Sequence, residues 1–260
     1  MTGAAHGRLV LVPTPLDFGV ARPDGVADLR EVLPLGAIRS SARLGHWVAE
    51  NAKTLRAFLK RVDAIEPLAQ PLQSLHIIEL PRAQKGAARP QPAPAALQSL
   101  LAPALDGHDI GLACEAGMPA IADPGAALVA AAHAAQLEVQ PLPGPNSLLL
   151  ALAASGLNGQ SFAFVGYLPV ETSARAARIR ELEALSRRAG QTQLMIETPY
   201  RNAALLGALV SNLGAATRLS VSCGLTLAGG WTRSATIAQW RAEPKAIAAD
   251  PPPVFALLAS

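Results

Sequence analysis

The fold of this chain is decided by the stretch Cys114-Glu115-Ala116-Gly117-Met118-Pro119-Ala120-Ile121-Ala122-Asp123-Pro124-Gly125. It follows a short apolar run, residues 109–113, and precedes an Ala-rich helical pattern over residues 126–135. This order predicts a strand, a Gly/Pro-rich loop and a helix. In an open parallel sheet such loops lie beyond the carboxyl ends of the strands, where ligands bind. Small residues in the loop allow backbone N–H groups to approach a ligand closely.

The first half of the chain repeats this alternation of strand and helix about five times. Strands are predicted over residues 9–12, 45–49, 75–80, 109–113 and 138–142. Helices are predicted over residues 28–38 with a break at Pro34, from Asn51 to Val62, and over 96–105, 126–135 and 148–154. The alternation predicts an α/β fold whose mainly parallel five-stranded sheet has helices on both faces. The strand ends at Pro13, Glu50, Glu115 and Pro143 then meet at one edge.

The second half has a different pattern, with short strands and fewer crossover helices. Strands are predicted over residues 161–165, 193–197, 219–223 and 253–258, with a further candidate around Trp231, and helices over 173–188 and 202–213. This favours a mixed α/β sheet in a second domain. We expect domains over residues 1–143 and 144–260, and a surface loop over residues 81–95, which hold four prolines and three Arg or Lys residues.

The composition fits a cytoplasmic protein with an ordinary core. Half of the 260 residues are hydrophobic and 16% are charged, yet no run reaches the roughly 18 apolar residues of a membrane span. We do not expect residues 1–8 to form a signal peptide. The formal net charge of +3 permits a polyanionic partner without requiring one. Aromatic residues make up only 4%, so platforms for stacking bases are not indicated.

The sequence offers few reactive side chains. Cys114 and Cys223 are far apart and are expected to be buried thiols, and the five histidines include no i, i+4 pair, so we expect no metal. There is no dinucleotide-binding or Walker A glycine pattern and no nucleophile elbow. This favours a reaction that depends on positioning, with the reactive group supplied by a bound cofactor.

Six motifs in order resemble the tetrapyrrole methylase superfamily over residues 9–258. They are residues 12–15 (Val-Pro-Thr-Pro), 115–119 (Glu-Ala-Gly-Met-Pro), 123–125 (Asp-Pro-Gly), 141–145 (Pro-Leu-Pro-Gly-Pro), 166–169 (Gly-Tyr-Leu-Pro) and 197–201 (Glu-Thr-Pro-Tyr-Arg). Within that superfamily the chain resembles, as a divergent paralogue, the branch of small-subunit ribosomal RNA 2′-O-methyltransferases.

The resemblance implies an S-adenosylmethionine-dependent methyltransferase whose cofactor lies in a cleft between two α/β domains. It also implies a homodimer, with RNA or a ribosomal subunit as the partner. Carried over position by position, the cofactor contacts are Leu16, Glu115, Ala116, Gly117, Ile121, Asn146, Ser147, Glu197 and Gly224 or its neighbour Leu225.

The chain departs from the RNA-methylating branch on the acceptor side. Residues 16–19 are Leu-Asp-Phe-Gly where the branch has Ile-Gly-Asn-Leu, and residues 50–53 are Glu-Asn-Ala-Lys where it has Glu-Asp-Thr-Arg. Residues 223–227 are Cys-Gly-Leu-Thr-Leu where it has Arg-Glu-Leu-Thr-Lys.

Transfer to a hydroxyl needs a base or late proton loss to solvent. The candidates for the base are Glu50 and Asp17, and Lys53 or Arg201 could hold a phosphate or carboxylate. Helix caps and surface ion pairs explain these residues equally well, and Asn51 is a good N-cap.

Two other functions remain open from the sequence. One is methylation of a tetrapyrrole-like or other small molecule, which a deep enclosed cleft would favour over an open basic one. The other is a cofactor-binding protein without turnover.

Overall fold

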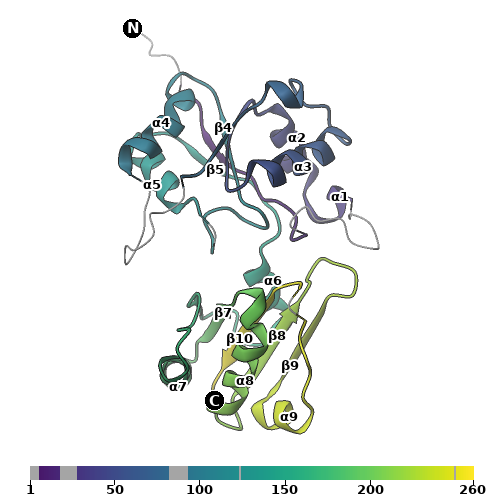
Figure 1. Ribbon diagram of the computed structural model, residues 1–260, viewed down its shortest axis with the longest axis vertical. Coiled ribbons are helices and arrows are strands. Elements are labelled where there is room, and N and C mark those ends of the chain that lie inside the picture. Colours follow the sequence, from purple (N-terminus) through teal and green to yellow (C-terminus); the bar gives the residue numbers. More distant parts are fainter. Residues whose placement is uncertain (1–5, 18–27, 82–92, 123, 249) are drawn as a thin grey trace. The chain divides into compact units, whose positions relative to one another are not determined.

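A computed structural model describes the chain except for residues 1–5, 18–27, 82–92, 123 and 249. Most of the predicted loop over residues 81–95, and Asp123 of the opening motif, therefore lie outside the described residues. The chain divides into two compact units, Met1–Pro145 and Asn146–Ser260, and each is described by itself. The helices and strands of both are labelled in Figure 1.

The first unit is built on a five-stranded parallel sheet. Its strands are β1 (Leu9–Leu11), β2 (His46–Ala49), β3 (His76–Glu79), β4 (Ile110–Ala113) and β5 (Val139–Pro141). Their order is β3-β2-β4-β1-β5, and every neighbouring pair is parallel. The carboxyl ends of the strands therefore share one edge. This confirms the predicted fold class of the first half.

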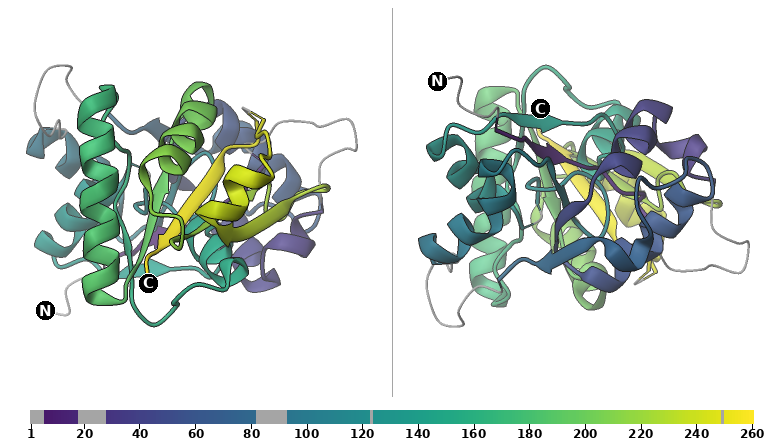
Figure 2. Two further views of the ribbon diagram at one scale, coloured as in Figure 1. Left: turned by 90° about the horizontal axis from the view of Figure 1, so that it is seen from below. Right: turned by 90° about the horizontal axis from the view of Figure 1, so that it is seen from above.

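Helices cover both faces of this sheet. They are α1 (Leu29–Val32), α2 (Leu35–Arg43), α3 (Ala52–Asp63), α4 (Pro94–Leu105) and α5 (Ala126–Ala134), with a 3-10 turn η1 (Leu72–Ser74). The first three pack with Val10, Trp47 and Ala49 in one core, and α4 and α5 pack with Leu9 and Val48 in another. The alternation of β-strand side chains places neighbouring residues in opposite cores. Figure 2 shows the two layers of helices on either side of the sheet.

Local sequence explains where several of these helices begin. The predicted break at Pro34 is confirmed, because α1 ends before it and Pro34 is the N-cap residue of α2. Proline has no N–H to donate and is tolerated only at a helix start. Asn51 caps α3 by accepting hydrogen bonds from the backbone N–H groups of Lys53 and Thr54, as its residue type predicts.

The second unit is built on a mixed five-stranded sheet. Its strands are β6 (Phe162–Phe164), β7 (Thr192–Ile196), β8 (Arg218–Cys223), β9 (Trp231–Thr236) and β10 (Pro253–Leu258), in the order β6-β7-β10-β8-β9. Only β6 and β7 are parallel, and the other neighbouring pairs are antiparallel. The mixed sheet and the candidate strand at Trp231 are therefore both confirmed.

Helices of the second unit lie on both faces of its sheet. They are α6 (Ser147–Ser155), α7 (Thr172–Ala189), α8 (Asn202–Asn212) and α9 (Ile237–Ala242), with a 3-10 turn η2 (Pro199–Arg201). Hydrophobic residues of α7, α8 and α9 share one core with Met195 and Phe255, whereas α6 packs against Leu194 and Val254 on the opposite face. The helix α9 was not predicted from the sequence.

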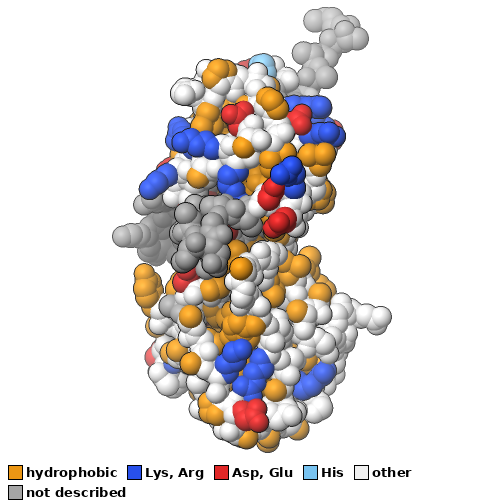
Figure 3. Space-filling view, turned by 90° about the vertical axis from the view of Figure 1, so that its right-hand side faces the viewer, with side chains coloured by type: hydrophobic (Ala, Val, Ile, Leu, Met, Phe, Trp, Pro, Cys, Tyr) orange, Lys and Arg blue, Asp and Glu red, His pale blue; other side chains and the backbone are white. Residues whose placement is uncertain are grey.

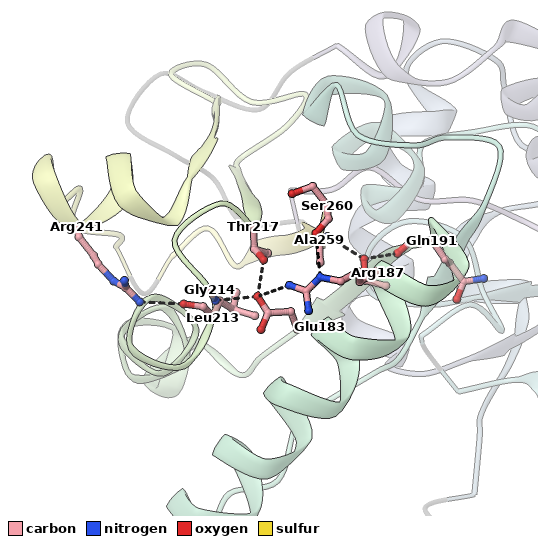
Figure 4. A network of polar contacts seen from close by, with 10 residues as sticks. Glu183, Arg187, Gln191, Leu213, Gly214, Thr217, Arg241, Ala259 and Ser260 are labelled. Carbon is pink, nitrogen blue, oxygen red and sulfur yellow. Dashed lines mark hydrogen bonds and ion pairs between the residues drawn. The ribbon is translucent and has the colours of Figure 1, made fainter.

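A polar network fixes α7 to its neighbours, as Figure 4 shows. The Glu183 carboxylate accepts hydrogen bonds from the Gly214 N–H (2.7 Å) and from the Thr217 hydroxyl. At the end of the helix the Arg187 Nε donates to the Ser260 carbonyl at 2.9 Å. Some of the charged residues of α7 thus stabilise the second unit.

Candidate functional site

The loops after β1 and β4 are joined by their backbones. The Thr14 N–H donates to the Gly117 carbonyl at 2.9 Å, and the Gly117 N–H donates to the Thr14 carbonyl at 3.0 Å. The buried Thr14 hydroxyl also donates to the Cys114 carbonyl at 3.3 Å. Two motifs a hundred residues apart in sequence therefore form one structure at the carboxyl edge of the sheet, where ligands of such sheets bind.

Gly117 occupies a position that favours glycine. Its φ of +84° is one that residues with a Cβ rarely adopt, and an added Cβ would lie 3.2 Å from Cδ2 of Leu16. The predicted cofactor residues Leu16 and Gly117 are thus neighbours. Glu115 and Ala116 precede Gly117 in the loop and are partly exposed.

The rest of this loop holds an unusual backbone. Ala120 and Ala122 have φ values of 67° and 65°, and such conformations are uncommon for residues other than glycine. Between them the predicted cofactor residue Ile121 is 45% exposed. Backbone strain and an exposed large apolar side chain both occur at ligand sites. The positive φ values of these two alanines could not be predicted from residue type, because alanine favours helix.

Glu50 lies at the end of β2, beside the same loop. Its Oε2 accepts a hydrogen bond from the Glu115 N–H at 3.2 Å, and its own N–H donates to the Ala113 carbonyl at 3.1 Å. Partial burial raises the pKa of the Glu50 carboxyl, the nearby Glu115 charge adds to this, and the Glu115 N–H opposes it. A carboxyl group with a raised pKa is suited to accept a proton at neutral pH.

Lys53 lies on the exposed face of α3, one turn beyond Glu50. Its backbone N–H is held by the Asn51 side chain at 2.9 Å. The Glu79 carboxylate accepts from the Ala52 N–H at 2.8 Å, so it binds the start of the same helix. The Lys53 ammonium forms no ion pair within the described part of the chain.

Asp17, the other predicted base, has a structural contact. Its Oδ2 accepts a hydrogen bond from Nη1 of Arg61 at 2.9 Å, and the two side chains are 7% and 19% exposed. This ion pair connects the segment after β1 to α3. A catalytic role for Asp17 stays a prediction.

In the second unit, Asn146 and Ser147 begin α6. Oδ1 of Asn146 accepts from the N–H groups of Leu148 at 3.0 Å and Leu149 at 3.1 Å, which makes it the N-cap. Its side chain is buried, whereas Ser147 is partly exposed. The motif around these residues therefore has a local structural role, and their predicted cofactor contacts stay predictions.

Glu197 and Arg201 form an ion pair after β7. Oε1 of Glu197 accepts from Arg201 Nη2 at 2.6 Å and Nε at 3.0 Å, and from the Thr198 N–H at 2.6 Å. Its other oxygen, Oε2, is buried and has no hydrogen-bond partner. A buried acceptor without a partner is costly, so Oε2 suits the donor of a ligand. The predicted role of Arg201 on a substrate competes with this pairing.

Gly224 lies where the chain turns between β8 and β9. Its φ is +60°, and an added Cβ would lie 2.9 Å from Cγ of Pro251. The Leu227 N–H closes the turn on the Gly224 carbonyl at 2.9 Å. Glycine is therefore required here by the turn, whatever its role toward a ligand.

Three histidines missed by the sequence analysis come together at the opposite edge of the first sheet. The rings of His46 and His76 are stacked with centroids 4.9 Å apart, and His108 is 5.1 Å from His46. Burial lowers the pKa of His46, and the neighbouring charges of His76 and His108 lower it further. His46 and His76 lie near the starts of predicted strands and His108 directly precedes a third, which was the available signal.

Within the described residues, no group of three or more His, Cys, Asp or Glu side chains is arranged to hold a metal ion. Cys114 and Cys223 are both buried thiols, as predicted. Among the described helices, none has both the length and the apolar character that crossing a membrane requires.

Comparison with known proteins defines the class of this protein. Residues 49–241 match the tetrapyrrole (corrin/porphyrin) methylase family, and the chain belongs to that family. The resemblance that the motifs predicted is confirmed.

Curated relatives narrow the similarity to one branch. The chain is 31% identical over 195 residues to a "Ribosomal RNA small subunit methyltransferase I" of Halalkalibacterium halodurans, covering 75% of this chain and 56% of the relative. It is 38% identical over 127 residues to the protein of that name from Mesorhizobium japonicum, covering 49% and 42%. The chain thus spans about half the length of the curated relatives it matches.

Solved structures share the fold at low sequence identity. A Thermus thermophilus uroporphyrin-III C-methyl transferase complexed with S-adenyl homocysteine is 16% identical with a TM-score of 0.52, covering 97% of each chain. The methyltransferase CobJ is also 16% identical, with a TM-score of 0.55 over 98% of this chain and 95% of that chain.

Proposed function

We propose that this protein is an S-adenosylmethionine-dependent methyltransferase whose acceptor is small-subunit ribosomal RNA. The observation that carries the proposal is the similarity of 31–39% to curated relatives that share the name "Ribosomal RNA small subunit methyltransferase I". The Thermus thermophilus neighbour complexed with S-adenyl homocysteine supports the choice of cofactor.

The described residues fit such a cofactor in two places. In the first unit, the loop that Gly117 shapes exposes the side chain of Ile121 and leaves Glu115 and Ala116 partly exposed, so these three residues are accessible to a ligand. In the second unit, the buried Oε2 of Glu197 lacks a donor, and a nucleoside offers hydroxyl and amino donors. In the first unit, the residues that we expect to contact it are Leu16, Gly117 and Ile121. In the second unit, considered by itself, the candidate is Glu197.

When bound, the cofactor supplies an electrophilic methyl group on a sulfonium sulfur. Transfer of that methyl group to an acceptor hydroxyl would leave the demethylated cofactor as a neutral thioether and would release the proton of the hydroxyl. Glu50 would take that proton, because burial raises the pKa of its carboxyl group toward neutral pH.

The protein is further proposed to act in the cytoplasm, where ribosomal subunits are found, and as a homodimer. The homodimer is carried over from the resemblance to the family, and sedimentation at micromolar concentration tests it. A single species with the mass of the 26.8 kDa chain would contradict it.

Two measurements test the proposed activity. Calorimetric titration with S-adenosylmethionine and with its demethylated product should show saturable binding of both. Radiolabelled methyl transfer should then label small ribosomal subunits that lack the modification. Label in a porphyrin pool alone would favour a tetrapyrrole acceptor, and binding without any transfer would favour a cofactor-binding protein without turnover.

A further inference from the structure

We propose that the outer face of α3 is a docking surface for the phosphate backbone of the RNA substrate. The basic stripe consists of Lys53, Arg56 and Lys60, all exposed. On a helix with 3.6 residues per turn these positions lie within about 60° of one another and extend over about 10 Å. The proposal rests on the proposed function and deepens it.

The stripe carries three positive charges that no ion pair within the described residues engages. Arg56 Nη1 reaches the Ala52 carbonyl at 3.5 Å. By contrast Arg61, on the flank of the same helix, pairs with the buried Asp17. On this helix, Arg61 therefore has a structural role, whereas the three residues of the stripe are exposed to solvent.

Carboxylates on the neighbouring elements have hydrogen-bond or ion-pair partners outside the stripe. Glu79 on β3 binds the Ala52 N–H, and Asp63 at the end of α3 accepts from the Leu68 N–H at 3.0 Å. On α2, Arg39 pairs with Glu66 at 3.6 Å. Figure 3 views the side of the first unit on which α2 and α3 lie, and Lys and Arg side chains are spread over it.

The position of the stripe favours the substrate over another polyanion. Lys53 lies three residues after Glu50, the proposed base, so the stripe begins at the carboxyl edge of the sheet and leads away from it. A polynucleotide with one nucleotide near Glu50 could place neighbouring phosphates along α3. Cations exposed on a helix bind phosphates mainly by releasing counterions, without reading sequence.

The test compares two charge-matched triple variants of the full chain. The stripe variant is K53Q/R56Q/K60Q, and the control is R178Q/R180Q/R188Q on α7, which removes the same charge from the second unit. Binding to purified small-subunit ribosomal RNA is measured against salt concentration, together with calorimetric cofactor affinity. A third variant, K53R/K60R, keeps the charge of the stripe.

The stripe variant should lose three phosphate contacts. The plot of log binding constant against log salt concentration should then be less steep by about 2, and RNA affinity should fall about 100-fold at 0.1 M salt. The stripe variant should still bind cofactor as the wild type does, and the other two variants should bind RNA nearly as the wild type does. If the stripe variant binds RNA as tightly as the wild type, and the wild type methylates RNA, the proposed docking surface is wrong and the proposed function stands. An equal loss in the α7 control would also overturn it. A wild type that binds neither RNA nor subunits would overturn both.

Discussion

Replacing Gly117 by alanine tests whether the loop after β4 is a rigid part of the ligand site. The glycine has a φ of +84°, and an alanine Cβ would lie 3.2 Å from Leu16 Cδ2. A residue with a Cβ in this region costs about 1–2 kcal/mol. The Leu16 methyl is the end of a flexible side chain and can move by a few tenths of an ångström. The cost of the positive φ therefore accounts for most of the expected loss of free energy.

This strain can appear in either of two measurements. If the loop keeps its conformation, the free energy of unfolding falls by about 1–2 kcal/mol. If the loop relaxes instead, the cofactor must restore it, and its affinity falls by about tenfold for each 1.4 kcal/mol. Urea denaturation and calorimetric titration of the same variant measure the two losses. Their sum should be about 1–2 kcal/mol.

A matched glycine on α8 provides the control. Gly207 is helical, and an added Cβ would meet nothing within 4 Å. Replacing it by alanine should stabilise the protein by about 0.5–1 kcal/mol, because alanine favours helix, and leave cofactor affinity unchanged. A G117A variant with wild-type stability and wild-type cofactor affinity would show that the loop does not require glycine at residue 117.

Two further predictions concern side chains of the first unit. Asp17→Asn should lower the free energy of unfolding by about 2 kcal/mol. This value lies between those for exposed and for buried ion pairs, because the partner Arg61 is 19% exposed. Unchanged stability together with a lost rate of methyl transfer would indicate a catalytic Asp17 instead. The His46 pKa is lowered in the folded protein, so its neutral form is favoured by folding, and stability should fall as the pH drops below about 6.5, the unfolded value. Urea midpoints at pH 8 and pH 5.5 check this, and H76Q/H108Q should weaken the dependence; identical pH profiles for wild type and variant would contradict the role of the cluster.

The sequence predicted the features of the fold that depend on local patterns. The buried strand before Cys114, the break at Pro34 and the cap at Asn51 each follow from residue type and spacing. The strand order could not be predicted in this way, because it depends on which strands pack side by side. His46, His76 and His108 come together only because β2 lies between β3 and β4.

The candidate site was predictable as motifs but not as contacts. The motifs located Gly117 and Glu50 at strand ends, where parallel strands bring loops together. They did not indicate that Thr14 and Gly117 exchange two hydrogen bonds, or that Asp17 pairs with Arg61. Such pairings join segments far apart in sequence, and each partner alone resembles an ordinary loop or helix residue.

The identity of the methylated product decides whether the acceptor is a ribose hydroxyl of small-subunit ribosomal RNA. Small-subunit ribosomal RNA is incubated with the protein and S-adenosylmethionine, digested to nucleosides and analysed by mass spectrometry. We expect a 2′-O-methylated nucleoside, formed at a lower rate by the Glu50→Gln variant. No new methylated nucleoside under conditions where the cofactor is bound would contradict this expectation.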